Sequence, residues 1–592
     1  MKQLITRWGK HIQKDYVLQE YPRPDFVRDS FYNLNGEWEY AITKEAHVDV
    51  YDGKILVPFS PEAALSGVSR IVMPGDYLHY QKKFKVSADF CRGRIFLHFG
   101  AVDQECVVYL NGVKLGSHKG GYLPFCFEIT KIVRKDENVL ALCVTDDTEK
   151  KAHARGKQKL KKKGKYKSLF YTPNSGIWKT VWLESTPEQY MKGVRITPDF
   201  DNGSIKIDLQ AEGCLSEGHI RISENGVAVK ELDILVNQEM VVKIHNFHAW
   251  SPDTPNLYDV ELTYGEDRAT TYFGMRKYST GRDPRGMLRF YLNNEPYFFS
   301  GILDQGYWPE SLMTPPDDEA LIYDIYKMKG LGFNTVRKHI KVESERFYYH
   351  CDKIGMIVWQ DMPNGGGDYN MGLVTYLPNA SNWIARNLKD HWYTALKRTD
   401  EIGRRQYYAD LEGMVSLLYN HPSIAVWVPF NEGWGQFDAA KATKLIRSMD
   451  CSRLINEACG WFDQGGGDMY SIHNYIKKLK ISPQKDRVVA LTEYGGYSYP
   501  VKGHMACKKE FGYRAYQSKE ELTQSYQRLW EEELLPNIEK GLCSAIYTQL
   551  SDIEEEINGF MTYDREIDKM EEDTIKRLNQ KLYKRFRELT GL

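Results

Sequence analysis

Two glutamates in this sequence stand directly after strongly apolar runs, a position that suits proton transfer or nucleophilic attack. Glu432 follows the run 424–430 and one asparagine, and Glu493 closes the run 487–492. Aromatic residues and glycines come next in both places, so each carboxylate stands where a buried strand gives way to an open loop. Two opposed carboxylates are the equipment of glycoside hydrolysis: one protonates the leaving oxygen, and the other attacks or activates water. A single glutamate at a strand end is more often a cap or an ion-pair partner, so the inference depends on the two together.

The elements that must position these glutamates alternate between strands and helices from about residue 282 onward. Eight strands with helical segments between them over residues 282–592 indicate a TIM barrel. A doubly wound open sheet is the alternative, but no glycine-rich phosphate loop follows the first strand. The first helix is expected to begin at Thr314, with prolines in its first turn. The predicted strands are 297–302, 332–337, 356–361, 424–430, 453–458, 468–474, 487–493 and 544–550.

Polar side chains follow nearly all of the predicted strands. In a TIM barrel these positions form the rim where chemistry takes place, and the ends of strands four and seven can face one another across it. The rim contains only two scattered histidines, so we expect no metal site. Besides the two glutamates, the rim residues include Asp304, Arg337, His339, Asp361, Asn431, Tyr475 and Tyr547.

The sequence before residue 282 predicts two β-sandwiches. Residues 1–185 read as short strands, and the Asn-Gly pair at Asn111 is a strong signal for a two-residue hairpin. Residues 186–281 are again all-β, with a second Asn-Gly pair at Asn225, and their length and strand spacing fit an immunoglobulin-like sandwich. The basic run 149–167 is expected to be a solvated loop, with a ligand-binding patch as the alternative.

The composition argues against several classes of partner. The chain has 592 residues and a formal net charge of −1, so no basic excess points to nucleic acid or an anionic membrane. The ten cysteines are scattered singly, which predicts buried thiols in a reducing compartment. Neither an apolar N-terminal segment nor a long apolar run is present, so we expect a cytoplasmic protein. The β-domains leave a homo-oligomer as an open expectation.

Longer motifs resemble glycoside hydrolase family 2, which contains β-galactosidases, β-glucuronidases and β-mannosidases. The resemblance covers essentially the whole chain, and it implies a jelly-roll sugar-binding-like sandwich at 1–185, an immunoglobulin-like sandwich at 186–281 and a catalytic TIM barrel at 282–592. The motifs before the barrel are 33-NLNGEWEYAI-42, 55-ILVPFSPEAALSGV-68, 175-SGIWKTVWLE-184, 250-WSPDTPNLY-258 and 273-FGMRK-277. Those in the barrel are 293-NNEPYFFSGI-302, 334-NTVRKH-339, 351-CDKIGMIVWQDMPN-364, 420-NHPSIAVWVPFNEGW-434 and 491-LTEYGG-496.

The resemblance implies a role for each matching residue. Glu432 is expected to be the general acid/base and Glu493 the nucleophile of a double displacement that retains the anomeric configuration, with carboxyl groups about 5 Å apart. Asn431 is expected to hydrogen-bond the sugar 2-OH, and Arg337 to keep Glu493 ionised. Tyr475 is expected to donate to the same carboxylate. The other residues expected to bind the substrate or wall the site are Asp304, His339, Asp361, Trp434 and Tyr547.

Departures from the family patterns bear on the substrate. The loop after strand eight, 551–565, is short and acidic where glucuronidases carry an Asn-x-Lys triplet, and acidic residues repel a uronate. A retaining exo-acting β-galactosidase is therefore the leading prediction. The alternatives are an α-L-arabinosidase, a β-mannosidase, a β-glucuronidase, or a catalytically silent carbohydrate-binding protein. We expect a carbohydrate or glycoconjugate substrate and no required cofactor.

Overall fold

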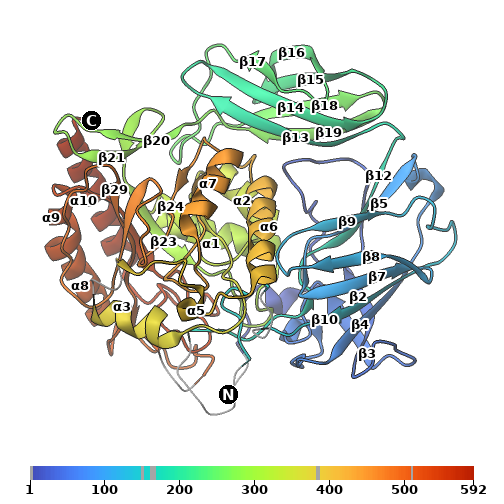
Figure 1. Ribbon diagram of the computed structural model, residues 1–592, viewed down its shortest axis with the longest axis horizontal. Coiled ribbons are helices and arrows are strands. Elements are labelled where there is room, and N and C mark those ends of the chain that lie inside the picture. Colours follow the sequence, from blue (N-terminus) through green and yellow to red (C-terminus); the bar gives the residue numbers. More distant parts are fainter. Residues whose placement is uncertain (1–3, 149–152, 161–168, 382–386, 508–510) are drawn as a thin grey trace.

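The computed structural model describes residues 4–148, 153–160, 169–381, 387–507 and 511–592. Figure 1 shows three bodies: a sandwich in blue, a second sandwich in green, and a strand barrel surrounded by helices that ends in red. The second sandwich lies above the other two in this view. The architecture confirms the fold class predicted from the sequence, two β-sandwiches followed by a TIM barrel.

The N-terminal sandwich packs a six-stranded sheet against a four-stranded sheet around one hydrophobic core. Their strand orders are β3-β2-β4-β10-β7-β8 and β1-β12-β5-β9. Asn111 and Gly112, between β7 and β8, have φ values of +54° and +82°, which confirms the predicted hairpin. The strands are β1 Phe31–Asn33, β2 Gly36–Thr43, β3 Gly53–Val57, β4 Tyr77–Phe84, β5 Arg94–Phe99, β6 Val102–Asp103, β7 Glu105–Leu110, β8 Val113–Lys119, β9 Phe125–Glu128, β10 Asn138–Thr145, β11 Gly176–Ile177 and β12 Val181–Thr186.

The second sandwich packs the sheet β13-β14-β17 against the sheet β16-β15-β18-β19. Alternate residues of β14, Ile205, Ile207 and Leu209, are buried, as expected for strands with one face in a core and the other in water. A small sheet, β20-β21-β22, leads from this body to the barrel. The strands are β13 Tyr190–Asp199, β14 Ser204–Glu212, β15 Glu217–Glu224, β16 Val227–Leu235, β17 Met240–Lys243, β18 Tyr258–Tyr264, β19 Asp267–Phe273, β20 Tyr278–Arg282, β21 Leu288–Leu292 and β22 Glu295–Tyr297.

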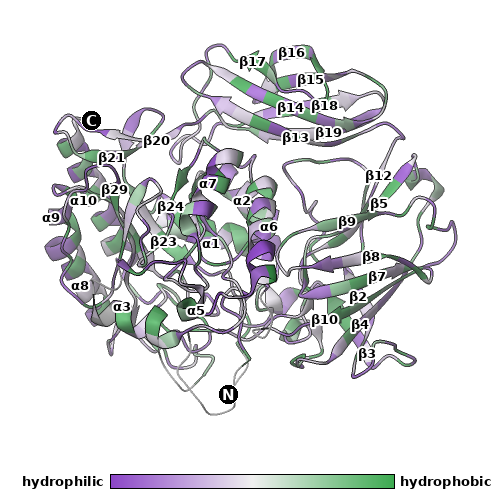
Figure 2. Cartoon of the chain, viewed as in Figure 1, coloured by the Kyte–Doolittle hydropathy of each residue, from purple (hydrophilic) through white to green (hydrophobic). Residues whose placement is uncertain are grey.

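Eight parallel strands form the barrel in the order β27-β26-β25-β24-β23-β32-β29-β28. Each overlaps one of the eight runs predicted from the sequence. The strand β23 is largely hydrophobic in colour in Figure 2, whereas β24 contains the charged Arg337 and Lys338. Both strands are buried along their whole length, because the barrel interior covers one face and helices cover the other. The strands are β23 Phe299–Asp304, β24 Thr335–Lys338, β25 Ile357–Asp361, β26 Ile424–Val428, β27 Leu454–Ile455, β28 Met469–Asn474, β29 Val488–Gly495 and β32 Leu542–Thr548.

Helices surround the barrel and bury one face each. The expected start of the first helix at Thr314 is wrong: the helix begins at Asp318, and the Asp317 carboxylate caps it. The Thr314 hydroxyl instead donates to the carbonyl oxygen of Trp178 in the N-terminal sandwich at 2.7 Å. The helices are α1 Asp318–Gly330, α2 Glu345–Ile354, α3 Leu377–Ala380, α5 Tyr393–Leu396, α6 Glu401–Leu417, α7 Ala439–Met449, α8 Lys519–Leu529, α9 Leu535–Ile538 and α10 Glu572–Thr590.

The segment that precedes β1 runs along all three bodies. Thr6 donates its backbone N–H to Glu310 of the barrel at 3.2 Å. The Arg28 guanidinium lies 3.0 Å from Asp267 of the second sandwich and 3.4 Å from Glu184 of the first, and all three side chains are buried. The segment therefore joins the bodies through polar contacts as well as chain connections.

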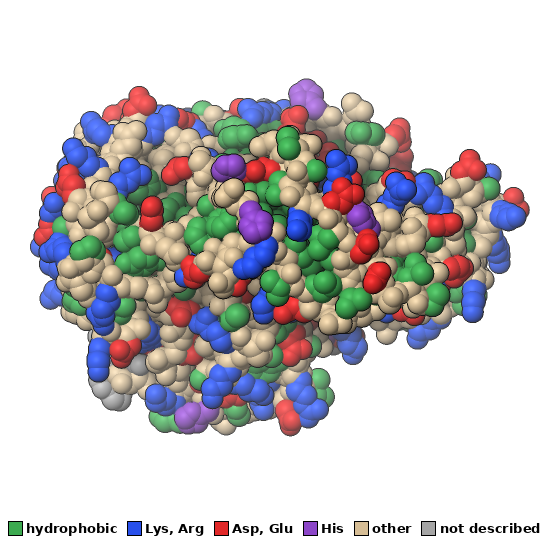
Figure 3. Space-filling model, turned by 90° about the horizontal axis from the view of Figure 1, so that it is seen from above, with side chains coloured by type: hydrophobic (Ala, Val, Ile, Leu, Met, Phe, Trp, Pro, Cys, Tyr) green, Lys and Arg blue, Asp and Glu red, His purple; other side chains and the backbone are tan. Residues whose placement is uncertain are grey.

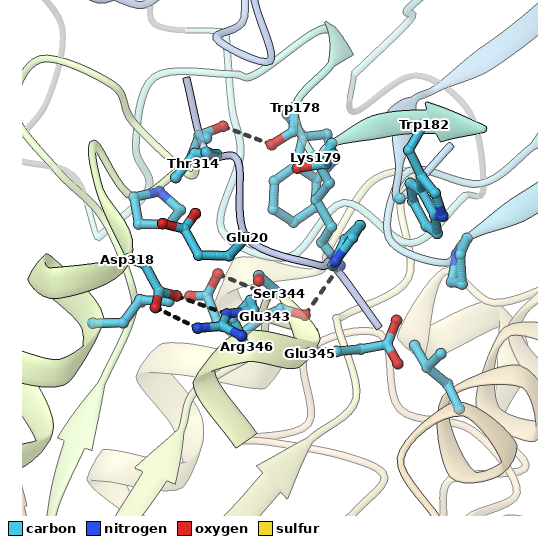
Figure 4. Close-up of a pocket in the computed structure, with 18 residues that line it drawn as sticks. Glu20, Trp178, Lys179, Trp182, Thr314, Asp318, Glu343, Ser344, Glu345 and Arg346 are labelled. Atoms are coloured by element: carbon cyan, nitrogen blue, oxygen red, sulfur yellow. Dashed lines mark hydrogen bonds and ion pairs between the residues drawn. The ribbon is translucent and has the colours of Figure 1, made fainter. Parts of the chain in front are cut away.

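A cavity between the N-terminal sandwich and the barrel marks their interface (Figure 4). Trp178 and Trp182 from the sandwich and Leu321 from α1 are among the residues that line it. Lys179 reaches across and donates to the backbone carbonyl of Glu343 in the barrel at 3.1 Å. Burial lowers the pKa of Lys179 to about 7. The two bodies thus meet over a tightly packed and partly polar surface.

The surface carries both signs of charge. Lys and Arg side chains are interspersed with Asp and Glu side chains over the face in Figure 3, in keeping with the net charge of −1. The ten cysteines are free thiols. None of the helices in the described part of the chain is both long and apolar enough to span a bilayer.

Candidate active site

Glu432 stands in a loop that turns sharply after β26. Its backbone is left-handed, with φ +53°, and Gly433 follows with φ +69°. A residue with a Cβ adopts this conformation only at a cost in free energy, and such residues recur at functional sites. The turn is held by Glu432 N–H, which donates to the Cys459 carbonyl at 2.8 Å, and by the Trp461 indole, which donates to the Glu432 carbonyl at 2.6 Å. The turn exposes a carboxylate directly after a buried strand.

Glu493 lies within β29 and receives four polar contacts, one of them from the Thr548 hydroxyl, which donates to Oε2 at 3.5 Å. Arg337 Nη1 donates to Oε1 at 2.9 Å, the Tyr475 hydroxyl donates to Oε2, and His473 Nε2 lies 3.5 Å from Oε1. Burial alone raises the pKa of Glu493, but the charges of His473 and Arg337 outweigh it and lower the pKa from 4.5 to about 2. Glu493 is therefore ionised at neutral pH.

The pKa of Glu432 is shifted in the opposite direction. Burial, together with the nearby Glu493 charge, raises the pKa of Glu432, against a hydrogen bond from His473. Ligand atoms of Glu432, His473 and Glu493 all lie within 4.8 Å of one another. This spacing fits the carboxyl separation of about 5 Å in retaining glycosidases and is too short for the about 6.5–9.5 Å of inverting ones. The arrangement can present a proton on one carboxyl and a nucleophile on the other.

A buried layer behind the carboxylates fixes the direction of Arg337. Its Nε and Nη2 donate to the two oxygens of Asp361, both at 2.9 Å, and Nη2 also donates to Asn431 Oδ1 at 2.7 Å. His339 Nδ1 lies 2.8 Å from the same aspartate. Because a bidentate contact fixes the guanidinium plane, Nη1 is left pointing at Glu493. Asn431 and His339 line the pocket, whereas Asp361 lies behind Arg337, and its expected contact with substrate stays a prediction.

Two more residues expected at the substrate lie behind the pocket. Tyr547 is fully buried and accepts a hydrogen bond from the Tyr497 backbone N–H at 3.3 Å. Asp304 pairs with Lys338 at 2.5 Å. Neither lines the pocket that contains Glu432 and Glu493, so their contact with substrate stays a prediction. Neighbouring residues of a strand point to opposite faces, and position at a strand end alone does not tell which face a side chain takes.

The basic run 149–167 is not wholly a solvated loop. Its described part, residues 153–160, lies against the barrel, where Arg155 N–H donates to the Asn364 carbonyl at 2.9 Å. Lys157 is only 9% exposed and lines the pocket that contains both carboxylates. The prediction of a hydrated loop is wrong for this part, and the rest of the run lies outside the described residues. The N-terminal sandwich therefore supplies part of the pocket.

The apolar wall of the pocket also comes from two bodies. Trp434, expected as a wall, lines the pocket and is almost fully buried. Phe170, from the N-terminal sandwich, stacks on its indole with ring centroids 5.0 Å apart and an angle of 24° between the planes. Tyr475 is stacked in the same way by Tyr513, at 3.8 Å. Flat rings held in this way offer surfaces for the apolar face of a sugar.

Lys157, Tyr513 and Glu556 line the pocket but were missing from the sequence-based set of site residues. His473, which contacts both carboxylates without lining the pocket, was missing as well. His473 stands two residues before Tyr475, so the two-residue period of a strand places it on the same face and was a usable signal. Glu556 belongs to the acidic loop after the eighth strand. Lys157 and Tyr513 come from irregular segments, which carry no periodic pattern.

One group among the described residues has the spacing of metal ligands, namely Glu432, His473 and Glu493. Two carboxylates and an imidazole suit a zinc-like cation. Burial lowers the pKa of His473, but the charge of Glu493 and the Cys459 and Glu432 contacts raise it to about 10. Only a neutral imidazole binds metal, so a protonated His473 disfavours a cation at neutral pH.

Three family models match successive parts of the chain. Residues 45–175 match the galactose-binding domain-like domain of glycosyl hydrolase 2, residues 189–276 match glycosyl hydrolases family 2, and residues 288–533 match the TIM barrel domain of that family. The chain belongs to glycoside hydrolase family 2. In this family 2 chain the three matched domains correspond, in order, to the first sandwich, the second sandwich and the barrel.

Relatives of this family 2 chain include the β-galactosidase of Thermoanaerobacter pseudethanolicus, 27% identical over 450 residues that cover 72% of this chain and 54% of that one. The chain spans little more than half the length of the curated relatives it matches, with 54% and 57% of them covered.

Solved structures include the β-glucuronidase of Dictyoglomus thermophilum, with a TM-score of 0.72 at 19% identity over 95% of this chain and 98% of that one. The β-glucuronidase of an uncultured Clostridium species gives 0.71 at 18% identity over 96% and 100%. At such identities the likeness shows a shared fold.

Proposed function

We propose that this chain hydrolyses the terminal β-linked sugar of a glycoside with retention of configuration. The observation that carries the proposal is the short distance between Glu432 and Glu493 together with their opposite protonation tendencies. Glu493 attacks the anomeric carbon while Glu432 protonates the leaving oxygen. Glu432 then takes a proton from water, and this water releases the sugar from Glu493.

The neighbouring residues assist this double displacement. Arg337 and Tyr475 keep Glu493 ionised and fix its orientation. The Asn431 amide faces the pocket and is held by Arg337, which orients it for the sugar 2-OH, where a hydrogen bond strengthens as positive charge develops on the ring. Trp434 excludes water from the leaving group, and this keeps Glu432 protonated near neutral pH.

For the glycone we propose a neutral sugar, with a β-galactoside first and an α-L-arabinopyranoside or β-mannoside next. The support is Glu556, a buried carboxylate that the loop after β32 places in the pocket. A carboxylate there repels a uronate and accepts hydrogen bonds from hydroxyl groups. The β-galactosidase among the relatives is consistent with this choice.

A β-glucuronide is the second candidate, and one observation favours it. Lys157 brings a buried ammonium into the same pocket, where it can attract a sugar carboxylate. Two solved structures that are similar in fold carry the name β-glucuronidase, although their identity of 18% and 19% supports the fold alone.

Hydrolysis of a nitrophenyl glycoside panel tests the proposal. The panel contains the β-galactoside, β-glucuronide, β-mannoside, β-glucoside, α-L-arabinopyranoside and α-L-arabinofuranoside, each assayed with the wild type and with Glu493→Ala. Release from a neutral glycoside that is lost in the variant, with a first product by NMR that has the anomeric configuration of the substrate, supports the proposal. Preferred release from the β-glucuronide overturns the neutral glycone, and a first product of the opposite anomeric configuration overturns retention. No release from any member favours a silent binding protein.

A further inference from the structure

The pocket contains a buried ion pair that the double displacement does not use. Lys157 Nζ of the N-terminal sandwich lies 3.8 Å from Glu556 Oε2 of the barrel, and the two side chains are 10% and 3% exposed. Both residues line the same pocket as Glu432 and Glu493. Burying two charges costs free energy unless hydrogen bonds satisfy them. A buried pair of this kind is therefore a candidate to bind a polar group of a ligand.

The Lys157 ammonium lacks hydrogen bonds. It carries three N–H donors, and a hydrogen bond from nitrogen to oxygen spans about 2.7–3.2 Å, so Glu556 at 3.8 Å is too distant to be one. Its other close neighbour is the ring of Tyr171, whose centre is 5.5 Å away. Within the described part of the chain no acceptor lies in hydrogen-bond range of Nζ, and the pocket is the space that its donors face.

Glu556, in contrast, is fixed by two donors. Asn558 Nδ2 donates to Oε1 at 3.1 Å, and the Tyr171 hydroxyl donates to Oε2 at 2.5 Å. Gln305, after the first barrel strand, donates in turn to the Tyr171 hydroxyl at 2.7 Å. Each carboxylate oxygen accepts one protein hydrogen bond and has a further lone pair. The carboxylate is therefore preorganised to accept one more donor.

We propose that Lys157 and Glu556 together bind one hydroxyl group of the glycone, at a carbon away from the anomeric centre. A hydroxyl can accept from the ammonium and donate to the carboxylate at once, which fits a pair held just beyond direct hydrogen-bond distance. Glu556 follows β32, and Tyr171 links it to Gln305 at the end of the neighbouring β23. Asn431 and Glu432 follow β26 elsewhere in the barrel, so the pair is expected to meet a different side of the sugar. This inference rests on the proposed function and deepens it to a hydroxyl-selective pocket.

Monodeoxy analogues test this contact directly. The binding of one glycone hydroxyl by both Lys157 and Glu556 is called the hydroxyl clasp below. The substrates are the neutral nitrophenyl glycoside that the wild type cleaves best and its analogues with one hydroxyl removed in turn. Lys157→Met and Glu556→Gln are each expected to lower kcat/KM on the parent glycoside about 10–100-fold, the value of a hydrogen bond to a charged group. On the one analogue that lacks the bound hydroxyl, wild type and variants are expected to agree within about threefold.

A matched control comes from the same segment. Lys159→Met removes a lysine two residues away that does not line the pocket, and it is expected to keep kcat/KM within about twofold. Thermal unfolding of every variant establishes that it is folded. An equal loss on the parent glycoside and on all analogues overturns the clasp, because a merely structural pair affects every substrate alike.

Failure of the proposed function gives a different pattern. If the wild type cleaves only the uronide, the neutral glycone is wrong whatever the variants do. If Lys157→Met then abolishes uronide cleavage while Glu556→Gln increases it, the pair recognises a carboxylate, and the hydroxyl clasp is overturned as well. If a neutral glycoside is cleaved and the variants equal the wild type, only the clasp is overturned.

Discussion

Replacing His473 by asparagine is expected to move both limbs of the pH profile of kcat/KM to higher pH. His473 lies 2.7 Å from Glu432 and 3.5 Å from Glu493, and its own pKa is raised to about 10, so it is a cation between two carboxylates. A cation favours the ionised form of each neighbour. The acid limb reports ionisation of Glu493 and the basic limb reports loss of the proton from Glu432. Without the cation both pKa values rise.

The size of the effect follows from the pKa of Glu493. Burial raises that pKa, yet His473, followed by Arg337, brings it from 4.5 down to about 2. The difference of about 2.5 pH units corresponds to about 3.4 kcal/mol at 1.36 kcal/mol per unit. Since the charge of His473 lowers this pKa more than those of Arg337 and His339, its removal is expected to raise the acid limb by at least about one unit. Asparagine retains a donor, so the basic limb is expected to rise by less.

The assay is kcat/KM on the best nitrophenyl glycoside from about pH 2 to pH 10, a range that reaches the pKa of Glu493. His504→Asn is a matched control, because His504 also pairs with a carboxylate, Asp564 at 2.8 Å, but this carboxylate is neither Glu432 nor Glu493. This control is expected to keep the wild-type limbs. If the two limbs of the His473→Asn pH profile stay at the wild-type pH values, or move in opposite directions, the reasoning is refuted. His473 would then not be a cation that acts on both glutamates.

Three further variants test other contacts. Tyr475→Phe removes a hydroxyl donor from Glu493, and kcat is expected to fall about 10–100-fold with little change in KM. Phe170→Ala removes the ring behind Trp434, and KM is expected to rise about tenfold, the value of about 1.4 kcal/mol of lost stacking. Arg28→Met leaves the buried Asp267 without its cation, whereas Glu184 keeps Arg23, and the first thermal unfolding transition is expected to fall, with a loss of about 3–5 kcal/mol.

Two of these variants, Tyr475→Phe and Arg28→Met, have a matched control. Tyr16→Phe alters a tyrosine that is 67% exposed and should leave kcat unchanged. Arg92→Met breaks an exposed pair with Asp29 and should lower the unfolding temperature little. If a control changes kcat or the unfolding temperature as much as its test variant does, the effect does not come from the contact that the test variant removes. A rise in KM for Tyr475→Phe without loss of kcat would assign that hydroxyl to binding rather than to the nucleophile.

The barrel and the carboxylate pair were predictable because their signals are local. Strands buried on both faces appear as continuous apolar runs, and Glu432 and Glu493 end two of the strongest ones. The turn at Asn111 was equally clear, since few residues tolerate a positive φ. The start of the first helix was misplaced because Thr314 found partners in another body of the protein, and a propensity rule does not include such contacts.

The composition of the pocket was less predictable, for two physical reasons. The direction of a side chain at a strand end depends on register, and so Asp304 and Tyr547 were expected in the pocket but lie behind it. Burial of a charged segment depends on the surface it meets, and so Lys157 was expected in water but lies beside Glu556. Both depend on contacts between residues far apart in the sequence, which a pattern of a few residues does not contain.

The origin of Lys157 in the N-terminal sandwich has a consequence for how such enzymes diverge. The two glutamates come from barrel strands, whereas part of the surface around the sugar comes from a separate body some 270 residues earlier in the chain. Changes in that earlier body can alter which sugar is accepted without disturbing the groups that break the bond. Recombination within the gene can therefore exchange the sandwich segment that contacts the sugar while the two glutamates of the barrel stay unchanged.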